Sequence, residues 1–219
     1  MKKITIILLA ALTALPALSQ GIKDKLFEKS IFFDKSAWIS TSKDHLKLSL
    51  ETTRVCPNSV TYGYADISHD YQNISSNSGN YVQIFREQKF WELPLYLHGE
   101  FRMYNGFDGF HTHTGYIGAA YTFNFSHGFI APEPLMMLVD EDKLGFQFSL
   151  VGDFAWKYTS FSFFYDYMAN HGDTDYLELR LWLHPLENTS WKKLKFGAIG
   201  CMSPINKDGE YFLAVKYSF

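Results

Sequence analysis

The sequence predicts an all-β protein that closes into an antiparallel transmembrane β-barrel of about ten to twelve strands, with twelve favoured. Three observations support this fold class. The C-terminal strand carries an apolar group at every second position, the N-terminus has the features of an export signal, and aromatic residues make up 18% of the chain. An alternating strand rich in aromatics is typical of a sheet that separates an apolar from a polar medium.

The C-terminal strand gives the strongest of these signals. Its alternate residues form one continuous apolar face and are Tyr211, Leu213, Val215, Tyr217 and Phe219. In a soluble protein such a face needs a second layer to cover it, whereas in an outer-membrane barrel it faces lipid. We therefore expect this strand to contact outer-membrane lipid and the machinery that assembles such barrels.

The N-terminus predicts export from the cytoplasm. Lys2 and Lys3 precede an apolar run that ends near Leu18, and two small residues, Ala17 and Ser19, lie near a plausible cleavage point. We expect residues 1–19 to be a removed signal peptide and residues 20–219 to form one barrel domain. The predicted location is the outer membrane of a Gram-negative bacterium.

Composition excludes several functions. The formal net charge of -3 gives no basic footprint for nucleic acid. No metal-type cysteine spacing occurs, and neither a cofactor nor a metal is expected. Cys56 and Cys201 are in an exported chain where a disulfide could form, but sequence alone gives no geometry for it.

Turn-rich stretches divide the chain into extended segments. These segments are expected near residues 30–40, 45–55, 59–68, 80–91, 93–104, 113–125, 144–156, 158–168, 175–184, 193–202 and 210–219. A further segment from Pro132 to Val139 is a candidate strand that would bring the number to twelve.

Two segments alternate very regularly. In residues 93–104, one face carries leucine, phenylalanine and methionine, and the other carries Tyr96, His98, Glu100 and Arg102. The second segment carries four leucines opposite Tyr176, Glu178, Arg180, Trp182 and His184. Such alternation also suits a secreted soluble β-sandwich, but the terminal strand and the export signal favour a barrel with lipid outside and a polar lumen inside.

Three stretches resemble known barrels. Residues 86–100 and 121–129 resemble an uncharacterised outer-membrane barrel family of Bacteroidetes that is itself similar to Tsx, the nucleoside-specific channel. Residues 62–66, Tyr-Gly-Tyr-Ala-Asp, resemble an early strand of Tsx. This resemblance implies a barrel of about twelve strands and a narrow lumen that passes nucleosides.

The two polar rows, extended by Asp66 and Asp153, are the candidate solute-binding wall. We expect Tyr96, His98, Glu100, Arg102, Glu178, Arg180 and Trp182 to share one constriction, where aromatic faces and polar groups contact a small polar solute. The alternative is that these charges pair with one another and fill a narrow barrel.

The predicted function is a channel or binding pore for small hydrophilic solutes such as nucleosides. The alternatives are a structural or surface-interaction barrel without a pore, or a lipid-modifying enzyme. Enzymatic activity is not expected, because the adjacent Ser126 and His127 would point to opposite faces of a strand. His111 and His113 could share a face as metal ligands, but an exposed loop end is the preferred interpretation.

Overall fold

The computed structural model describes residues 32–71, 79–89, 93–106, 111–139, 143–169 and 174–219. The expected signal peptide and the first residues of the expected barrel domain lie outside these ranges. Among the described residues, no helix is long and apolar enough to cross a bilayer.

The described residues form thirteen strands in one sheet. Their bounds are β1 Phe32–Thr41, β2 His45–Cys56, β3 Ser59–Asp70, β4 Gly79–Lys89, β5 Leu95–Asn105, β6 His111–Tyr121, β7 Phe123–Phe125, β8 Gly128–Val139, β9 Lys143–Ala155, β10 Thr159–Ala169, β11 Thr174–Leu183, β12 Leu194–Ser203 and β13 Asp208–Ser218. Each expected extended segment overlaps a strand, although the one at 113–125 covers two, β6 and β7. The candidate segment at Pro132 to Val139 belongs to the longer strand β8.

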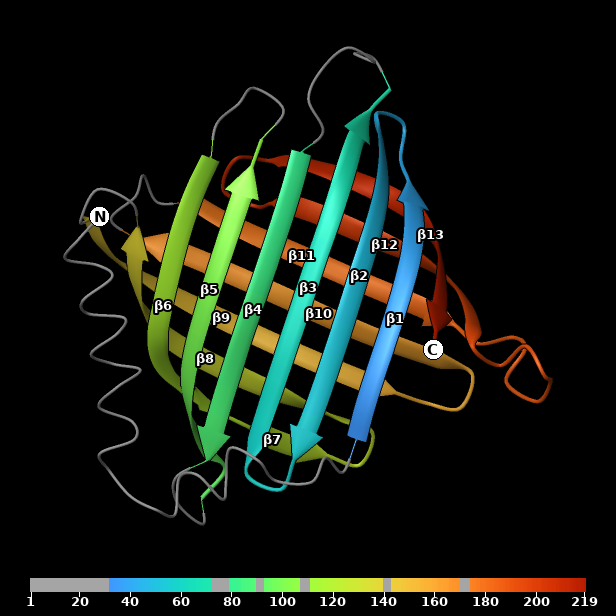
Figure 1. The fold of residues 1–219 in the computed structure, drawn as a ribbon, viewed down its shortest axis with the longest axis horizontal. Coiled ribbons are helices and arrows are strands. Elements are labelled where there is room, and N and C mark those ends of the chain that lie inside the picture. Colours follow the sequence, from blue (N-terminus) through green and yellow to red (C-terminus); the bar gives the residue numbers. More distant parts are fainter. Residues whose placement is uncertain (1–31, 72–78, 90–92, 107–110, 140–142, 170–173) are drawn as a thin grey trace.

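The sheet closes on itself. Neighbours along the chain pair in antiparallel fashion, and β1 pairs with β13 from Ser36↔Ser218 to Thr41↔Leu213. The short strand β7 continues the course of β6 beyond Thr122 and pairs with the start of β8. The described chain is therefore a closed antiparallel barrel with twelve strand positions, as expected. It is flattened, with β1–β6 in one layer and β8–β13 in the other (Figure 1).

The two prolines of β8 occupy a break in the ladder. β8 pairs with β6 from Leu135 onward and with β7 up to Ile130, so the stretch between them faces no hydrogen-bonded partner strand on that side. Pro132 and Pro134 lie in this stretch. Because proline has no amide hydrogen to donate, it fits where a ladder is interrupted.

The outer face of the wall is apolar and exposed. The alternate residues of β13 expected to face lipid all point outward, and Tyr211 and Leu213 are 73% and 71% exposed. Exposed outward residues of other strands include Ile39, Leu48, Ile67, Ile84, Phe101, Ile117, Phe146, Leu181 and Phe196. An apolar band of this extent around a closed barrel requires lipid, which places the barrel in an outer membrane.

Aromatic side chains mark one rim of this band. Phe125, Trp156 and Phe219 come at or just after the ends of β7, β9 and β13, which the antiparallel order brings to the same end of the barrel. Each is at least 44% exposed. Rings at this level are typical of the interface between lipid tails and headgroups.

The position of the lipid band can be tested by placing an arginine at two positions on the outer face of one strand, one near the middle of the membrane and one near its edge. Leu179→Arg, near the middle of the outer face of β11, should lower the free energy of unfolding by about 2–4 kcal/mol. Leu183→Arg, at the end of that face, should lower it by about 0–1 kcal/mol. Urea titrations of barrels folded into lipid vesicles measure both values. Equal costs would contradict the assignment of the band.

Candidate functional site

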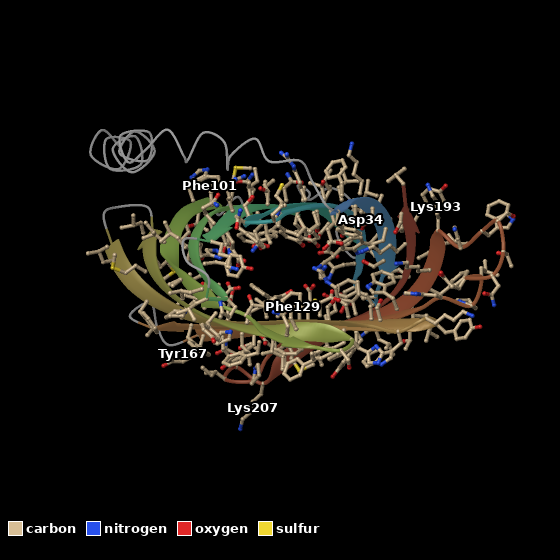
Figure 2. All side chains as sticks on the ribbon, turned by 90° about the horizontal axis from the view of Figure 1, so that it is seen from below. Asp34, Phe101, Phe129, Tyr167, Lys193 and Lys207 are labelled. Carbon is tan, nitrogen blue, oxygen red and sulfur yellow. The ribbon has the colours of Figure 1, made fainter. Side chains whose placement is uncertain are left out.

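The inner faces of the strands line the lumen. Figure 2 shows the side chains of Phe101 and Tyr167 outside the wall and that of Phe129 inside it. The residues expected to face the lumen are found on inner faces or, for His184, directly after β11. They are Tyr96, His98, Glu100, Arg102, Tyr176, Glu178, Arg180, Trp182, His184, Asp66 and Asp153.

A first set of polar residues, the β5 network, consists of Gln83, Glu100, Arg102, Ser149 and Asp166. Arg102 donates through Nε to Glu100 and through Nη1 to Asp166 Oδ2 at 2.6 Å. Gln83 Nε2 donates to Glu100 at 2.7 Å, and Ser149 Oγ donates to Asp166 at 2.5 Å. Because β5 and β10 are not neighbours, Arg102 joins the two layers of the flattened barrel.

A second set, the β11 network, consists of Glu51, Tyr62, Glu178, Arg180 and Lys216. Arg180 donates through Nε to Glu178 and through Nη1 to Glu51 Oε1 at 3.3 Å. Glu51 also accepts from Lys216 Nζ at 2.8 Å and from the Tyr62 hydroxyl at 2.9 Å. This network joins β11 to β2 across β12, β13 and β1.

The two networks share one plan. In each, an arginine pairs with the glutamate two residues before it and with a carboxylate of a distant strand. Each guanidinium also lies over an aromatic ring: Arg102 Cζ is 4.6 Å from the Tyr116 ring centroid, and Arg180 Cζ is 5.2 Å from that of Trp38. Ion pairs and ring contacts together hold both arginines against the wall.

Aromatic rings continue the wall beyond the two networks. Trp182, Trp38, Tyr64 and Tyr81 follow one another with ring centroids 5.7–5.9 Å apart. A second row runs from Tyr62 through Phe85 to His98, with separations of 4.9 and 5.2 Å. These rows run across the strands, because successive rings come from different strands.

The residues expected to share one constriction fall into two groups of ion pairs. His98, Glu100 and Arg102 belong to one side of the lumen, whereas Glu178 and Arg180 pair with Glu51 on another. Among the described residues, no ion pair joins the two sets. Each arginine pairs with a carboxylate of the opposite layer: Arg102 joins β5 to β10, and Arg180 joins β11 to β2.

Several inner-face residues contact the two predicted rows without belonging to them. Glu51, Glu87, Glu133 and Lys216 all contact residues of the two predicted rows. Their own segments alternate, so the period-two rule would have placed them inward once the strands were assigned. Their contacts depend on strand order and register, which alternation does not contain.

The other cysteine, histidine and serine residues considered in the sequence lie in different parts of the barrel. Cys56 and Cys201 do not form a disulfide with each other. Cys56 ends β2 at one end of the barrel, whereas Cys201 lies near the other end, on β12, where its Sγ contacts Glu178 Oε2 at 3.6 Å. His111 and His113 are in strand β6 instead of a loop, and His113 stacks on the outward Phe101 at 6.3 Å. Ser126 and His127 form the turn between β7 and β8.

Acidic residues outnumber basic residues on the described inner faces. The acidic ones are Asp34, Glu51, Asp66, Asp70, Glu87, Glu100, Glu133, Asp153, Asp166, Glu178, Asp208 and Glu210. The basic ones are Lys47, Lys89, Arg102, Arg180, Lys195 and Lys216. The lumen wall is therefore net negative, which favours cations over anions near it.

This closed barrel, with an apolar exterior and a charged lumen, has the architecture of an outer-membrane porin. Among solved structures, the KdgM porin matches with a TM-score of 0.55 and 12% identity over 85% of this chain and 99% of that chain. KdgM in complex with disordered oligogalacturonate matches with a TM-score of 0.54 and 12% identity, covering the same shares.

The NanC porin gives a similar match, with a TM-score of 0.55 and 6% identity over 86% of this chain and 99% of that chain. Neither a protein-family model nor a curated protein sequence matches the chain. At these identities the likeness is one of fold, a porin-like barrel of about the same size.

The pairing of the two arginines predicts a ranking of stability losses. Arg102→Met leaves Glu100 and Asp166 buried without their cation, at 2% and 1% exposure, and should cost about 3–5 kcal/mol. Arg180→Met should cost less, because Glu178 and Glu51 are 14% and 15% exposed and Lys216 still contacts Glu51.

Urea unfolding of both variants in lipid vesicles measures this ranking. Adding Asp166→Asn to Arg102→Met should recover part of the loss, because it removes one uncompensated carboxylate. A cost below that of Arg180→Met would show that the β5 network is not a tightly paired unit.

Proposed function

We propose that this barrel is an outer-membrane channel for small hydrophilic solutes that contain a flat ring, with neutral nucleosides as the leading class. The observation that carries the proposal is the pair of aromatic rows on the lumen wall, bounded by the two arginine networks. Aromatic rings stack on bases and sugars, and fixed polar groups exchange hydrogen bonds with their hydroxyls.

The charge arrangement favours neutral solutes over acidic ones. Arg102 and Arg180 each already pair with two carboxylates, so neither is free to bind a sugar acid. The wall also carries more acidic than basic residues. KdgM has been solved with oligogalacturonate, an acidic oligomer, and this charge pattern argues against the same class of solute here.

The sequence resemblance to the Tsx-like barrels supports nucleosides within this neutral class. The segment Tyr62 to Asp66 that carries part of it lies on β3, where Tyr62 and Tyr64 belong to the aromatic rows. The resembling residues thus coincide with the part of the wall that suits a base.

A second candidate is a barrel that does not conduct. Its support is that both arginines cross the lumen between layers and that several inner side chains, His98 among them, are nearly inaccessible. Planar-bilayer recording separates the two candidates: steps of conductance support the channel, and their absence with a correctly folded barrel supports the closed one.

Selectivity is tested by removing one carboxylate from each network. Glu100→Gln combined with Glu178→Gln leaves each arginine with a single acidic partner, so the lumen becomes more positive. Conductance should shift from cations toward anions, and nucleoside uptake into liposomes should change. Glu187→Gln, in the loop after β11, is the matched control. Unchanged selectivity and uptake would mean that these networks do not border the pathway.

The role of the aromatic rows is tested with two phenylalanines on opposite faces of neighbouring strands. Phe85 lies on the inner face of β4 between Tyr62 and His98, whereas Phe101 points outward from β5. Phe85→Leu should weaken nucleoside binding by about 1–3 kcal/mol, the range for base stacking on a ring. Phe101→Leu should leave binding unchanged. Titration calorimetry with a neutral nucleoside measures both, and equal affinities would remove the rows from the site.

A further inference from the structure

A buried histidine is surrounded by carboxylates in the lumen wall. His98 is 1% exposed, and its ring nitrogens lie close to Glu87, Glu100 and Glu133, which come from β4, β5 and β8. The three carboxylates carry more negative charge than one imidazole can balance, and a neutral imidazole balances none of it.

One tautomer of the imidazole suits metal binding. Nε2 lies 3.0 Å from Glu100 Oε2, and Glu100 is itself held by Arg102 and Gln83. With the Nε2 hydrogen directed to Glu100, Nδ1 presents its lone pair to the other two carboxylates. A histidine whose second nitrogen donates to a carboxylate is the usual arrangement behind a metal-binding imidazole.

Among the described residues, no lysine or arginine forms an ion pair with Glu87 or Glu133. Arg102 pairs with Glu100 and Asp166, so its charge is already shared. Within the described ranges, the charged-group contact of Glu87 and of Glu133 is to His98 Nδ1, at 3.3 and 3.6 Å. Their side chains are 11% and 7% exposed, so two carboxylates are kept largely from water with one imidazole between them.

The distances suit a small divalent ion. One ligand atom from each of Glu87, His98 and Glu133 lies within 4.8 Å of the others. In a tetrahedral Zn²⁺ site with bonds of about 2.0–2.2 Å, ligand atoms are about 3.4 Å apart. We propose that Glu87, His98 Nδ1 and Glu133 bind a divalent transition-metal ion, with Zn²⁺ as the best match, on the lumen wall.

The local backbone brings these residues together. On the inner face of β6, Gly118 lies in register with His98 of β5 and Leu135 of β8. A Cβ at position 118 would be 2.2 Å from the Pro134 carbonyl oxygen, so only glycine allows this approach. Glu133 lies between Pro132 and Pro134, whose rings restrict the backbone on which the carboxylate is mounted.

The site would give the lumen a coordination position as well as a charge. Three protein ligands leave one position of a tetrahedral ion for water or for an oxygen of a passing solute. The ion would also neutralise Glu87 and Glu133 and reduce the excess of negative charge on the wall. The proposal is independent of whether the lumen conducts, because binding is measured on the folded barrel itself.

The test uses the untagged barrel folded in detergent, stripped with a chelator and dialysed. Elemental analysis and titration calorimetry with Zn²⁺ should give one tightly bound ion per chain. Glu133→Gln and His98→Gln should each weaken binding by at least about a hundredfold. Glu100→Gln, which removes only the group behind the imidazole, should weaken it by about 10–100-fold. Co²⁺ in place of Zn²⁺ should give the intense visible bands of a four-coordinate site.

His184→Gln is the matched control, since His184 lies at the inner end of another strand and contacts Ser160 instead of the acidic group. It should bind Zn²⁺ like the unsubstituted barrel. Heat-modifiable gel migration confirms that each variant is folded, and Glu87→Gln replaces any variant that is not. A stripped, folded barrel that takes up no Zn²⁺, or equal affinities for the unsubstituted barrel and Glu133→Gln, would overturn the proposal and leave a protonated His98 as the cation between the carboxylates.

Discussion

Closure of the backbone hydrogen-bond ladder is the constraint on which the rest of this structure depends. In lipid no water satisfies a free amide or carbonyl, so a sheet can cross the membrane only if its first and last strands pair. The pairing of β1 with β13 meets this requirement. Once the wall is closed, each residue faces either lipid or lumen, and the period-two alternation of apolar and polar side chains follows directly.

The lumen places a second demand on the sequence, because charges inside a narrow barrel must find partners within it. The arginine networks meet that demand by reaching across the flattened ends, where opposite layers come close enough for direct ion pairs. Aromatic rings from β11, β1, β3 and β4 form a row along the same wall.

Much of the fold could be predicted because it depends on alternation, which is local. The outward face of β13 and the inward direction of Glu100 and Arg180 follow from counting residues along a strand. What could not be predicted depends on which strands face each other across the lumen. Arg102 meets Asp166 from a strand four positions away in the barrel, and His98 meets Glu133 across a glycine of β6. Neither contact can be derived from the spacing of residues in the sequence.

The interrupted ladder beside β8 has a mechanical consequence. From Ala131 to Pro134 this strand is tied on one side by its register with β9, whereas on the other side it lies between two separate short ladders. Along this line the wall therefore has fewer ladder bonds than where both neighbours of a strand pair with it, and such a region opens more easily. Glu133 lies in this stretch and contacts His98 of β5. An ion bound between them would link β8 to β5 where β8 has no hydrogen-bonded neighbour on that side.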